Sequence, residues 1–217
     1  MARCPDVPFD PGPSHGGQSP TEVICHRTYG SWPGDYGVGK GSRGGISFHF
    51  LVGTDEGQWV QFVDTNEVAY HARGDNTGTI GIEVSGTDGD VMTDWQVRAL
   101  GHICRWISDT HGIPLVHYQG GRTSTFNGWR DHNQVAGSDH TDYWSETDWA
   151  RIVAAAGGQE DDMTPDQSAK LDAVFNAIGR LDAEGDGTTV SWSAWMQHLE
   201  NIEAAVARIE QRLTAPQ

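Results

Sequence analysis

One almost entirely apolar stretch, TIGIEVSG at residues 79–86, limits the folds available to this chain more than any other part of the sequence. Such a run is typical of a strand that is covered on both faces, so we expect it near the centre of a sheet. Side chains alternate along a strand, which places Glu83 on the opposite side from Ile82 and Val84. A buried carboxylate is costly without a partner. Glu83 therefore either forms a structural salt bridge, for example with Arg73, or has a chemical role.

The segments around this strand predict an α/β fold. The hydrophobic pattern predicts further strands at residues 21–28, 46–53 and 58–63 and helices at residues 92–112 and 145–156. Thr93 can cap the longer helix, and Gly112 can end it. The glycine-rich segment 32–45 is expected to be a loop. We therefore predict a mixed central β-sheet flanked by helices on both faces.

Composition and periodicity change after residue 158, which predicts three parts of the chain. Residues 1–158 form the predicted α/β domain, residues 159–162 an acidic linker, and residues 163–217 a two-helix tail. In the tail, apolar residues recur at alternating spacings of four and three, as in a coiled coil: Trp195, Leu199, Ile202, Val206, Ile209 and Leu213. Two interpretations stay open, a helical hairpin docked on the α/β domain or a homo-oligomer formed through the tail.

The linker is also compatible with a signal for internal translation. Residues 159–163, Gln-Glu-Asp-Asp-Met, can be encoded with AGGAGG about five nucleotides before the ATG codon of Met163. That sequence and spacing are typical of a bacterial ribosome-binding site. We therefore predict a second, short product that begins at Met163 and joins the full-length chain through the tail.

Net charge and hydropathy exclude several classes of partner. The formal net charge of −16 disfavours binding to the phosphate backbone, so no nucleic-acid partner is expected. No apolar stretch is long enough for a membrane helix, so no membrane insertion is expected. The proline-rich segment 1–20 lacks the apolar core of a secretory signal, which predicts synthesis in the cytoplasm. The cysteines form no paired motif, which disfavours a disulfide framework.

Histidine and aspartate are concentrated in RDHNQVAGSDHTDYW at residues 130–144, which contains His132, His140 and Asp142. Catalytic zinc sites take three protein ligands of this kind and leave one position open. His26, at the end of an apolar strand, can complete a set with His132 and Asp142. A single histidine is far more often a surface or hydrogen-bonded residue, so the spacing alone leaves both a metal site and a structural role open.

Six segments of the sequence, in this order, resemble the zinc-dependent N-acetylmuramoyl-L-alanine amidases that include phage endolysins, bacterial recycling enzymes and peptidoglycan recognition proteins. The segments are EVICHRT (22–28), SFHFLVGTDEGQWVQFV (47–63), EVAYHARGDN (67–76), TIGIEVSG (79–86), GIPLVHY (112–118) and DHNQVAGSDHTDYW (131–144). The resemblance implies the peptidoglycan recognition protein-like α/β fold. It also implies one Zn²⁺ in the domain, held by His26, His132 and Asp142.

The resemblance further implies roles for residues beside the metal. Glu83 would be the general base that takes a proton from the attacking water, and His140 would stabilise the oxyanion. His71 and Asn76 would contact the substrate in the groove. Some members of the family have a catalytic tyrosine where this chain has Phe48, which has no hydroxyl group. Glu83 would therefore carry the proton transfer.

These expectations together predict a phage endolysin that hydrolyses the amide bond between N-acetylmuramic acid and L-alanine in bacterial peptidoglycan with a zinc-activated water. It would be made in the host cytoplasm and reach the cell wall after holin-type release. Two alternatives stay open: a cytoplasmic amidase that recycles muropeptides, and a non-catalytic peptidoglycan-binding module. The presence of Glu83 beside three ligands disfavours the module, and the tail at residues 163–217 disfavours the recycling enzyme.

Overall fold

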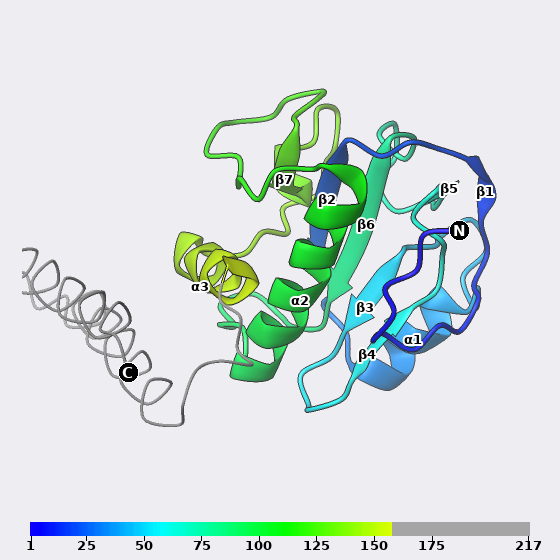
Figure 1. The fold of residues 1–217 in the computed structure, drawn as a ribbon, viewed down its shortest axis with the longest axis horizontal. Coiled ribbons are helices and arrows are strands. Elements are labelled where there is room, and N and C mark those ends of the chain that lie inside the picture. The colour runs from blue at the N-terminus through cyan, green and yellow to red at the C-terminus, as the bar shows by residue number, and fades with distance from the viewer. Residues whose placement is uncertain (158–217) are drawn as a thin grey trace, which may run out of the picture. The chain divides into compact units, whose positions relative to one another are not determined.

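A mixed five-stranded sheet forms the centre of residues 1–157, the part of the chain that this computed structural model describes (Figure 1). The strands lie in the order β4-β3-β6-β2-β7 and comprise β2 (Glu22–Arg27), β3 (Phe50–Val52), β4 (Trp59–Gln61), β6 (Thr79–Val84) and β7 (Gly128–Asp131). Neighbouring strands are parallel except for the antiparallel pair β3 and β4. β6 is the middle strand, as its apolar sequence predicts.

The predicted linker (159–162) and tail (163–217) lie outside the described residues. The domain boundaries, the coiled-coil seam and the internal start at Met163 therefore stay predictions from the sequence.

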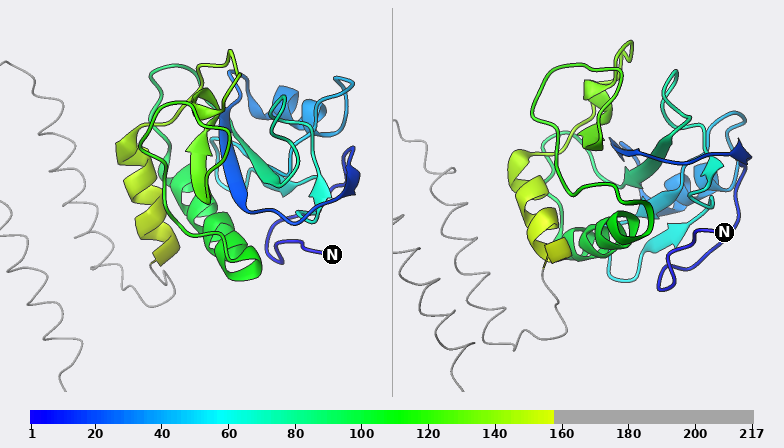
Figure 2. Two further views of the ribbon diagram at one scale, coloured as in Figure 1. Left: turned by 90° about the horizontal axis from the view of Figure 1, so that it is seen from above. Right: turned by 45° about the horizontal axis from the view of Figure 1, so that its top comes forward.

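Helices α2 (Asp94–His111) and α3 (Glu146–Gly157) cover one face of the sheet (Figure 2). α2 begins after Thr93, whose hydroxyl accepts a hydrogen bond from Gln96 N–H at 3.2 Å, and ends at the left-handed Gly112. Both boundaries confirm the sequence prediction. Within residues 1–157, no helix is long and apolar enough to cross a membrane.

The opposite face carries α1 (Trp32–Gly39), inside the segment that glycine content predicts to be a loop. That prediction is wrong for residues 32–39, where packing outweighs the poor helix propensity of glycine, and residues 40–45 are irregular as predicted. Tyr36 lies edge-on to Phe62 with ring centroids 5.2 Å apart, and a side chain at Gly39 would overlap the same ring. Pro33 occupies the first turn, where helices accept proline.

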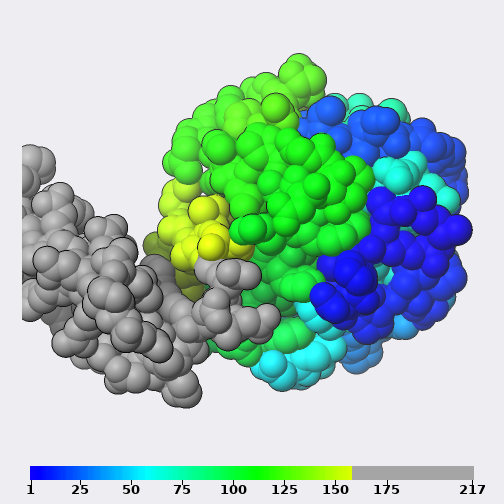
Figure 3. All heavy atoms as spheres, in the orientation of Figure 1, coloured from blue at the N-terminus to red at the C-terminus, as the bar shows by residue number. Residues whose placement is uncertain are grey.

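The N-terminal segment runs along the edge strand β4 and forms part of the face seen in Figure 3. Asp10 N–H donates to the carbonyl oxygen of Gln61 in β4 at 3.0 Å. Further along the chain, β1 (His15–Gly17) pairs with β5 (Glu67–Val68). These contacts satisfy backbone groups that an uncovered edge strand would expose.

A buried arginine in β7, Arg130, joins three segments that surround the site. Its guanidinium forms an ion pair with Glu22 of β2 and lies 2.9 Å from a carboxylate oxygen of Asp75. A buried charge is tolerated only when it is paired. The two pairs fix β7, and the 3₁₀ turn η1 (His132–Gln134) that follows it, against β2 and the loop before β6.

Candidate active site

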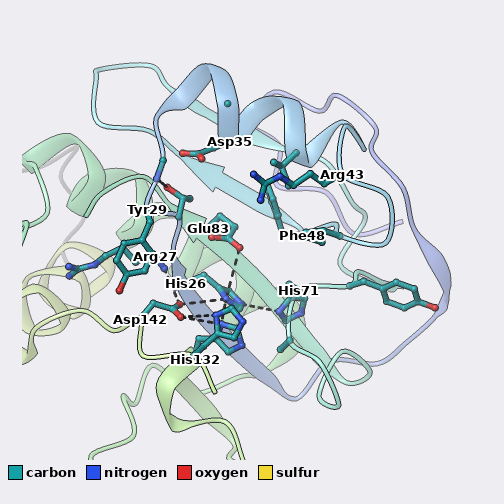
Figure 4. Close-up of a pocket in the computed structure, with 18 of the residues that line it drawn as sticks. His26, Arg27, Tyr29, Asp35, Arg43, Phe48, His71, Glu83, His132 and Asp142 are labelled. Atoms are coloured by element: carbon teal, nitrogen blue, oxygen red, sulfur yellow. Dashed lines mark hydrogen bonds and ion pairs between the residues drawn. The ribbon is translucent and has the colours of Figure 1, made fainter. Parts of the chain in front are cut away.

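Three side chains from distant parts of the sequence converge at the C-terminal ends of β2 and β7 (Figure 4). His26, His132 and Asp142 are all buried, and one potential ligand atom from each lies within 4.8 Å of the others. His26 Nδ1 is 2.9 Å from His132 Nδ1. Oxygens of Asp142 are 3.8 Å from His26 Nδ1 and 3.4 Å from His132 Nδ1. The structure thus brings together the three residues that the sequence analysis proposes as metal ligands.

The fold explains this convergence. β2 and β7 are parallel neighbours, so their C-terminal ends meet at the same edge of the sheet. His26 is the penultimate residue of β2, and His132 directly follows β7. Asp142 comes from the loop before α3 and accepts a hydrogen bond from Arg27 N–H at 3.2 Å. Trp144 Nε1–H donates to the carbonyl oxygen of His26 at 3.3 Å, which anchors the same loop to β2.

Burial and mutual contacts set the protonation of this cluster. Burial lowers the pKa of His26 well below its ordinary value, and the neighbouring His132 lowers it further. Burial acts to raise the pKa of Asp142, but interactions with His132 and the hydrogen bond from the backbone N–H of Arg27 outweigh it and lower that pKa overall. A neutral imidazole beside an ionised carboxylate is the state in which these groups bind cations.

The spacing of the cluster fits a zinc ion. Four-coordinate zinc with bonds of about 2.1 Å places its ligand atoms about 3.4 Å apart. The two imidazole nitrogens are 2.9 Å apart, Asp142 Oδ1 is 3.4 Å from His132 Nδ1, and Asp142 Oδ2 is 3.8 Å from His26 Nδ1, so the separations lie on either side of that value. Two histidines and one carboxylate are also a ligand set of catalytic zinc sites. The cluster is therefore able to hold a metal ion.

Glu83 lies beside the cluster on the neighbouring strand. Its Oε1 is 4.0 Å from His26 Nδ1. Within residues 1–157, Glu83 has no ion pair with an arginine or lysine, so the alternative of a salt bridge to Arg73 is not realised. Burial raises the pKa of Glu83 to about 8, and the charges of Asp142 and Asp35 contribute to the rise. A carboxylate with this pKa can accept and release a proton near neutral pH.

His140 lies on the open side of the cluster. Its side chain is 59% exposed, and its ring stacks on that of His132 with centroids 4.0 Å apart. Its Nδ1 is 3.3 Å from Asp142 Oδ1, and the side chain also lines the cavity. His140 can therefore reach both the cluster and a molecule in the cavity.

Phe48 is buried and lines the same cavity, where it presents no hydroxyl group.

The two residues that the resemblance assigns to substrate binding also contact the protein. His71 and Asn76 both line the cavity. His71 Nδ1 is 3.1 Å from His26 Nε2. Asn76 Oδ1 accepts hydrogen bonds from the backbone N–H groups of His71 and Ala72 at 2.9 and 2.8 Å. Asn76 therefore holds the turn that carries His71, and substrate binding by either residue stays a prediction.

A cavity of about 860 Å³ opens over the cluster. Its walls include aromatic and basic side chains, among them Tyr29, Arg43, Tyr70 and Arg73. The volume lies in the range of pockets that bind small molecules. The wall also carries the carboxylates of Asp35, Glu83 and Asp142, so the cavity presents groups of both charges.

Sequence reasoning missed two residues of the cavity wall. Asp35 of α1 is buried and accepts a hydrogen bond from Ser85 Oγ–H at 2.7 Å. This residue is missed because the sequence analysis places it in a loop. Tyr29 has a φ of 54° in the turn after β2, a conformation that bulky residues rarely adopt. Its hydroxyl donates to Asp88 at 2.7 Å. No sequence pattern predicts a left-handed backbone conformation at a tyrosine.

Several solved structures have a similar fold. A selenomethionine derivative of AmpD has a TM-score of 0.56 and 22% identity, covering 71% of this chain and 98% of that chain. Staphylococcus aureus hydrolase AmiA, in complex with its ligand, has a TM-score of 0.55 and 14% identity, covering 71% and 84%. The N-acetylmuramoyl-L-alanine amidase LysC from Clostridium intestinale URNW has a TM-score of 0.51 and 18% identity, covering 69% and 96%. No curated protein matches the chain.

Sequence comparison with protein families gives a more specific result than the shared fold. A family model described as N-acetylmuramoyl-L-alanine amidase matches residues 16–145. This range is more than half of the 217 residues and contains the whole cluster of His26, His132 and Asp142. The chain therefore belongs to the N-acetylmuramoyl-L-alanine amidase family.

Proposed function

We propose that this chain is a phage endolysin that hydrolyses the amide bond between the lactyl group of N-acetylmuramic acid and L-alanine in peptidoglycan. The proposal rests on the buried cluster of His26, His132 and Asp142 beside Glu83, whose pKa is raised to about 8. A metal-ligand set next to a carboxylate that can take and give a proton suits the attack of water on an amide. The proposed ion is one Zn²⁺.

The residues of the site divide the work of hydrolysis. Zinc held by His26, His132 and Asp142 would supply Lewis acidity, which polarises a carbonyl and lowers the pKa of water. Glu83 would accept a proton from the attacking water as the water oxygen bonds to the carbonyl carbon. Glu83 would then return this proton to the L-alanine nitrogen as the C–N bond breaks. The products are a lactyl carboxyl group and the free amine of the peptide.

His140 would stabilise the negative charge that develops on the carbonyl oxygen. Its exposed ring lies next to the cluster, with Nδ1 3.3 Å from Asp142 Oδ1, so a ring N–H can reach a substrate oxygen. His71 and Asn76 line the same cavity and stay the predicted substrate contacts. The arginines of the cavity wall would attract the carboxylates of the peptide stem.

The endolysin assignment rests on the sequence that follows the amidase domain. Residues 163–217 add a predicted coiled coil, which an enzyme for small muropeptides does not require. We propose that these residues form a homo-oligomer and also bind the short product that starts at Met163. In this proposal the chain is made in the host cytoplasm and meets peptidoglycan after holin-type release.

Two substrates separate the endolysin from the recycling amidase and the binding module. The zinc-loaded chain is incubated with purified cell walls and, separately, with a soluble muropeptide, and newly exposed L-alanine amine is quantified. An endolysin releases this amine from walls and lowers their turbidity. Activity on the soluble muropeptide alone would contradict the endolysin, and no release from either substrate would contradict the amidase. A Glu83→Gln chain purified in parallel measures contaminating activity.

A further inference from the structure

The ring nitrogen of His26 that faces away from the cluster begins a chain of hydrogen bonds. His26 Nε2 is 3.1 Å from His71 Nδ1, and His71 Nε2 is 3.1 Å from Thr79 Oγ1. Thr79 Oγ1 is in turn 2.6 Å from the carbonyl oxygen of Asp75. Figure 4 shows His71 and Asp142 on opposite sides of His26. This series of hydrogen bonds therefore connects a predicted metal ligand to the protein backbone.

Chemistry fixes the direction of each of these hydrogen bonds. A carbonyl oxygen only accepts, so the single hydroxyl proton of Thr79 goes to Asp75. Thr79 Oγ1 must then accept from His71, which places a proton on His71 Nε2. His71 is partly buried and forms no ion pair within residues 1–157, so an imidazolium charge there would have no partner. The neutral ring, protonated on Nε2, keeps a free lone pair on Nδ1. That lone pair only accepts, so His26 donates from Nε2.

A neutral imidazole carries one proton, so a proton on Nε2 leaves His26 Nδ1 bare. This bare nitrogen is the atom that faces His132 and Asp142. We propose that His71 and Thr79 are positioning residues that hold His26 in the Nε2–H tautomer and thereby present its Nδ1 lone pair to the cluster. The inference rests on the proposed metal site for its purpose, but the tautomer is a property of the metal-free protein.

Residues close to His71 in the structure restrict the position of its ring. Thr79 and Gly81 are two residues apart in β6, so both face the same side of the strand. A side chain at Gly81 would overlap the ring of His71, so the ring packs directly on the strand backbone. Asn76 fixes the backbone of His71 from the loop, at 2.9 Å. Gly81 and Asn76 therefore limit the positions that the ring can take.

Nitrogen NMR of the metal-free chain tests the tautomer directly, because the chemical shifts of imidazole nitrogens report which one carries the proton. We expect His26 to be protonated on Nε2 in the native chain and in Thr79→Ser, which keeps the hydroxyl. In His71→Ala and Thr79→Val, the Nδ1–H form should become populated. The inference is overturned if native His26 carries its proton on Nδ1, or if both disruptive variants leave its spectrum unchanged.

Zinc affinity, measured by competition with a chelator, provides the second readout. Loss of the partner that orients a ligating histidine typically weakens metal binding by about 10- to 100-fold. We expect that loss in His71→Ala and Thr79→Val, and native affinity in Thr79→Ser. Gly81→Ala should also weaken binding because it displaces the ring of His71 while every hydrogen-bonding side chain remains. Native affinity in the two disruptive variants, together with native folding by circular dichroism, would contradict the inference.

The two measurements separate this inference from the proposed function. If the native chain binds no zinc but the proton of His26 moves from Nε2 to Nδ1 in His71→Ala, the proposed metal site is contradicted and the positioning role is supported. If the native chain binds zinc tightly and neither the tautomer nor the affinity responds to His71→Ala and Thr79→Val, the metal site stands and the positioning role fails. The native spectrum alone decides the tautomer even where a variant does not fold.

Discussion

His26 and Glu83 are direct register partners on the parallel strands β2 and β6, and His26 Nδ1 lies 4.0 Å from Glu83 Oε1. A proposed ligand and the proposed general base therefore come from two adjacent strands whose backbones are hydrogen-bonded. A slip of one residue in this pairing would turn one of the two side chains to the opposite face. The core of the sheet, rather than the loops, sets the distance between metal site and base.

Glu83→Gln should abolish proton transfer while it preserves the shape of the site. The amide is nearly isosteric but cannot accept the proton of the attacking water, so we expect a rate loss of about 10²- to 10⁴-fold. Zinc content and folding should remain native, as measured by elemental analysis and circular dichroism. Glu56→Gln is a matched control, because Glu56 is 73% exposed and pairs only with Arg98 on the surface. A near-native rate in Glu83→Gln would remove Glu83 from the mechanism.

His132→Ala should lose zinc and activity together. Only His26 and Asp142 would then remain as ligands, and two ligands hold the ion poorly. Metal content per chain and amidase rate should therefore fall in parallel. His102→Ala provides the control, because this histidine lies on α2 and pairs with Asp6 at the surface. An inactive His132→Ala chain that still held stoichiometric zinc would show that His132 is not a ligand.

His140→Ala, unlike His132→Ala, should lower the amidase rate without lowering the zinc content. The side chain is largely exposed beside the cluster, so its loss should leave zinc content unchanged. Loss of an oxyanion donor costs a rate factor on the order of 10² or more. The measurement is the amidase rate at saturating zinc together with metal content. A fall in zinc content would instead make His140 a ligand and question the role of Asp142.

Much of the fold could be predicted because local signals and tertiary packing agree. The apolar segment 79–86 is buried at the centre of the sheet, and Thr93 and Gly112 bound α2 as their capping chemistry predicts. α1 could not be predicted, because its stability comes from contacts such as that between Tyr36 and Phe62. These contacts join residues far apart in the sequence, and a glycine-rich segment gives no local sign of them.

The candidate site divides in the same way. Residue types alone leave His26, His132 and Asp142 open between a metal site and structural roles, and the resemblance of the six segments selects them as ligands. Parallel strands bring their elements together. The contact between His71 and His26 could not be foreseen, because it depends on the conformation of the loop after β5. The left-handed backbone of Tyr29 depends likewise on the turn between β2 and α1.

The internal start at Met163 is testable at the level of the gene. Expression of the natural gene should yield a small product spanning residues 163–217 that co-purifies with the full-length chain. Synonymous recoding of Glu160 changes the ribosome-binding site but not the protein, so it should remove the small product alone. Met163→Leu should do the same. A single product and a monomeric mass in light scattering would contradict both the internal start and the oligomer.

His49 should make the stability of the fold sensitive to mild acid. The ring is fully buried; Nδ1 accepts a hydrogen bond from Gly81 N–H at 3.0 Å, and Nε2–H donates to Glu67 O at 2.9 Å. Protonation of Nδ1 would break the first bond and bury a charge. Burial accordingly lowers the pKa of His49 from 6.5 to about 4.

The sign of the pH effect follows from this lowered pKa. Between pH 6.5 and about 4, the unfolded chain takes up a proton at position 49 that the folded chain does not, so stability falls as pH falls. The contribution of His49 over this range is about 3 kcal/mol. His49→Gln can make both hydrogen bonds but cannot titrate, so its free energy of unfolding should decline less between pH 7 and pH 4. Chemical denaturation of both metal-free chains measures this difference. The other histidines are common to both chains, so their contribution is the same. Parallel pH profiles of the two chains would show that His49 does not cause the acid sensitivity.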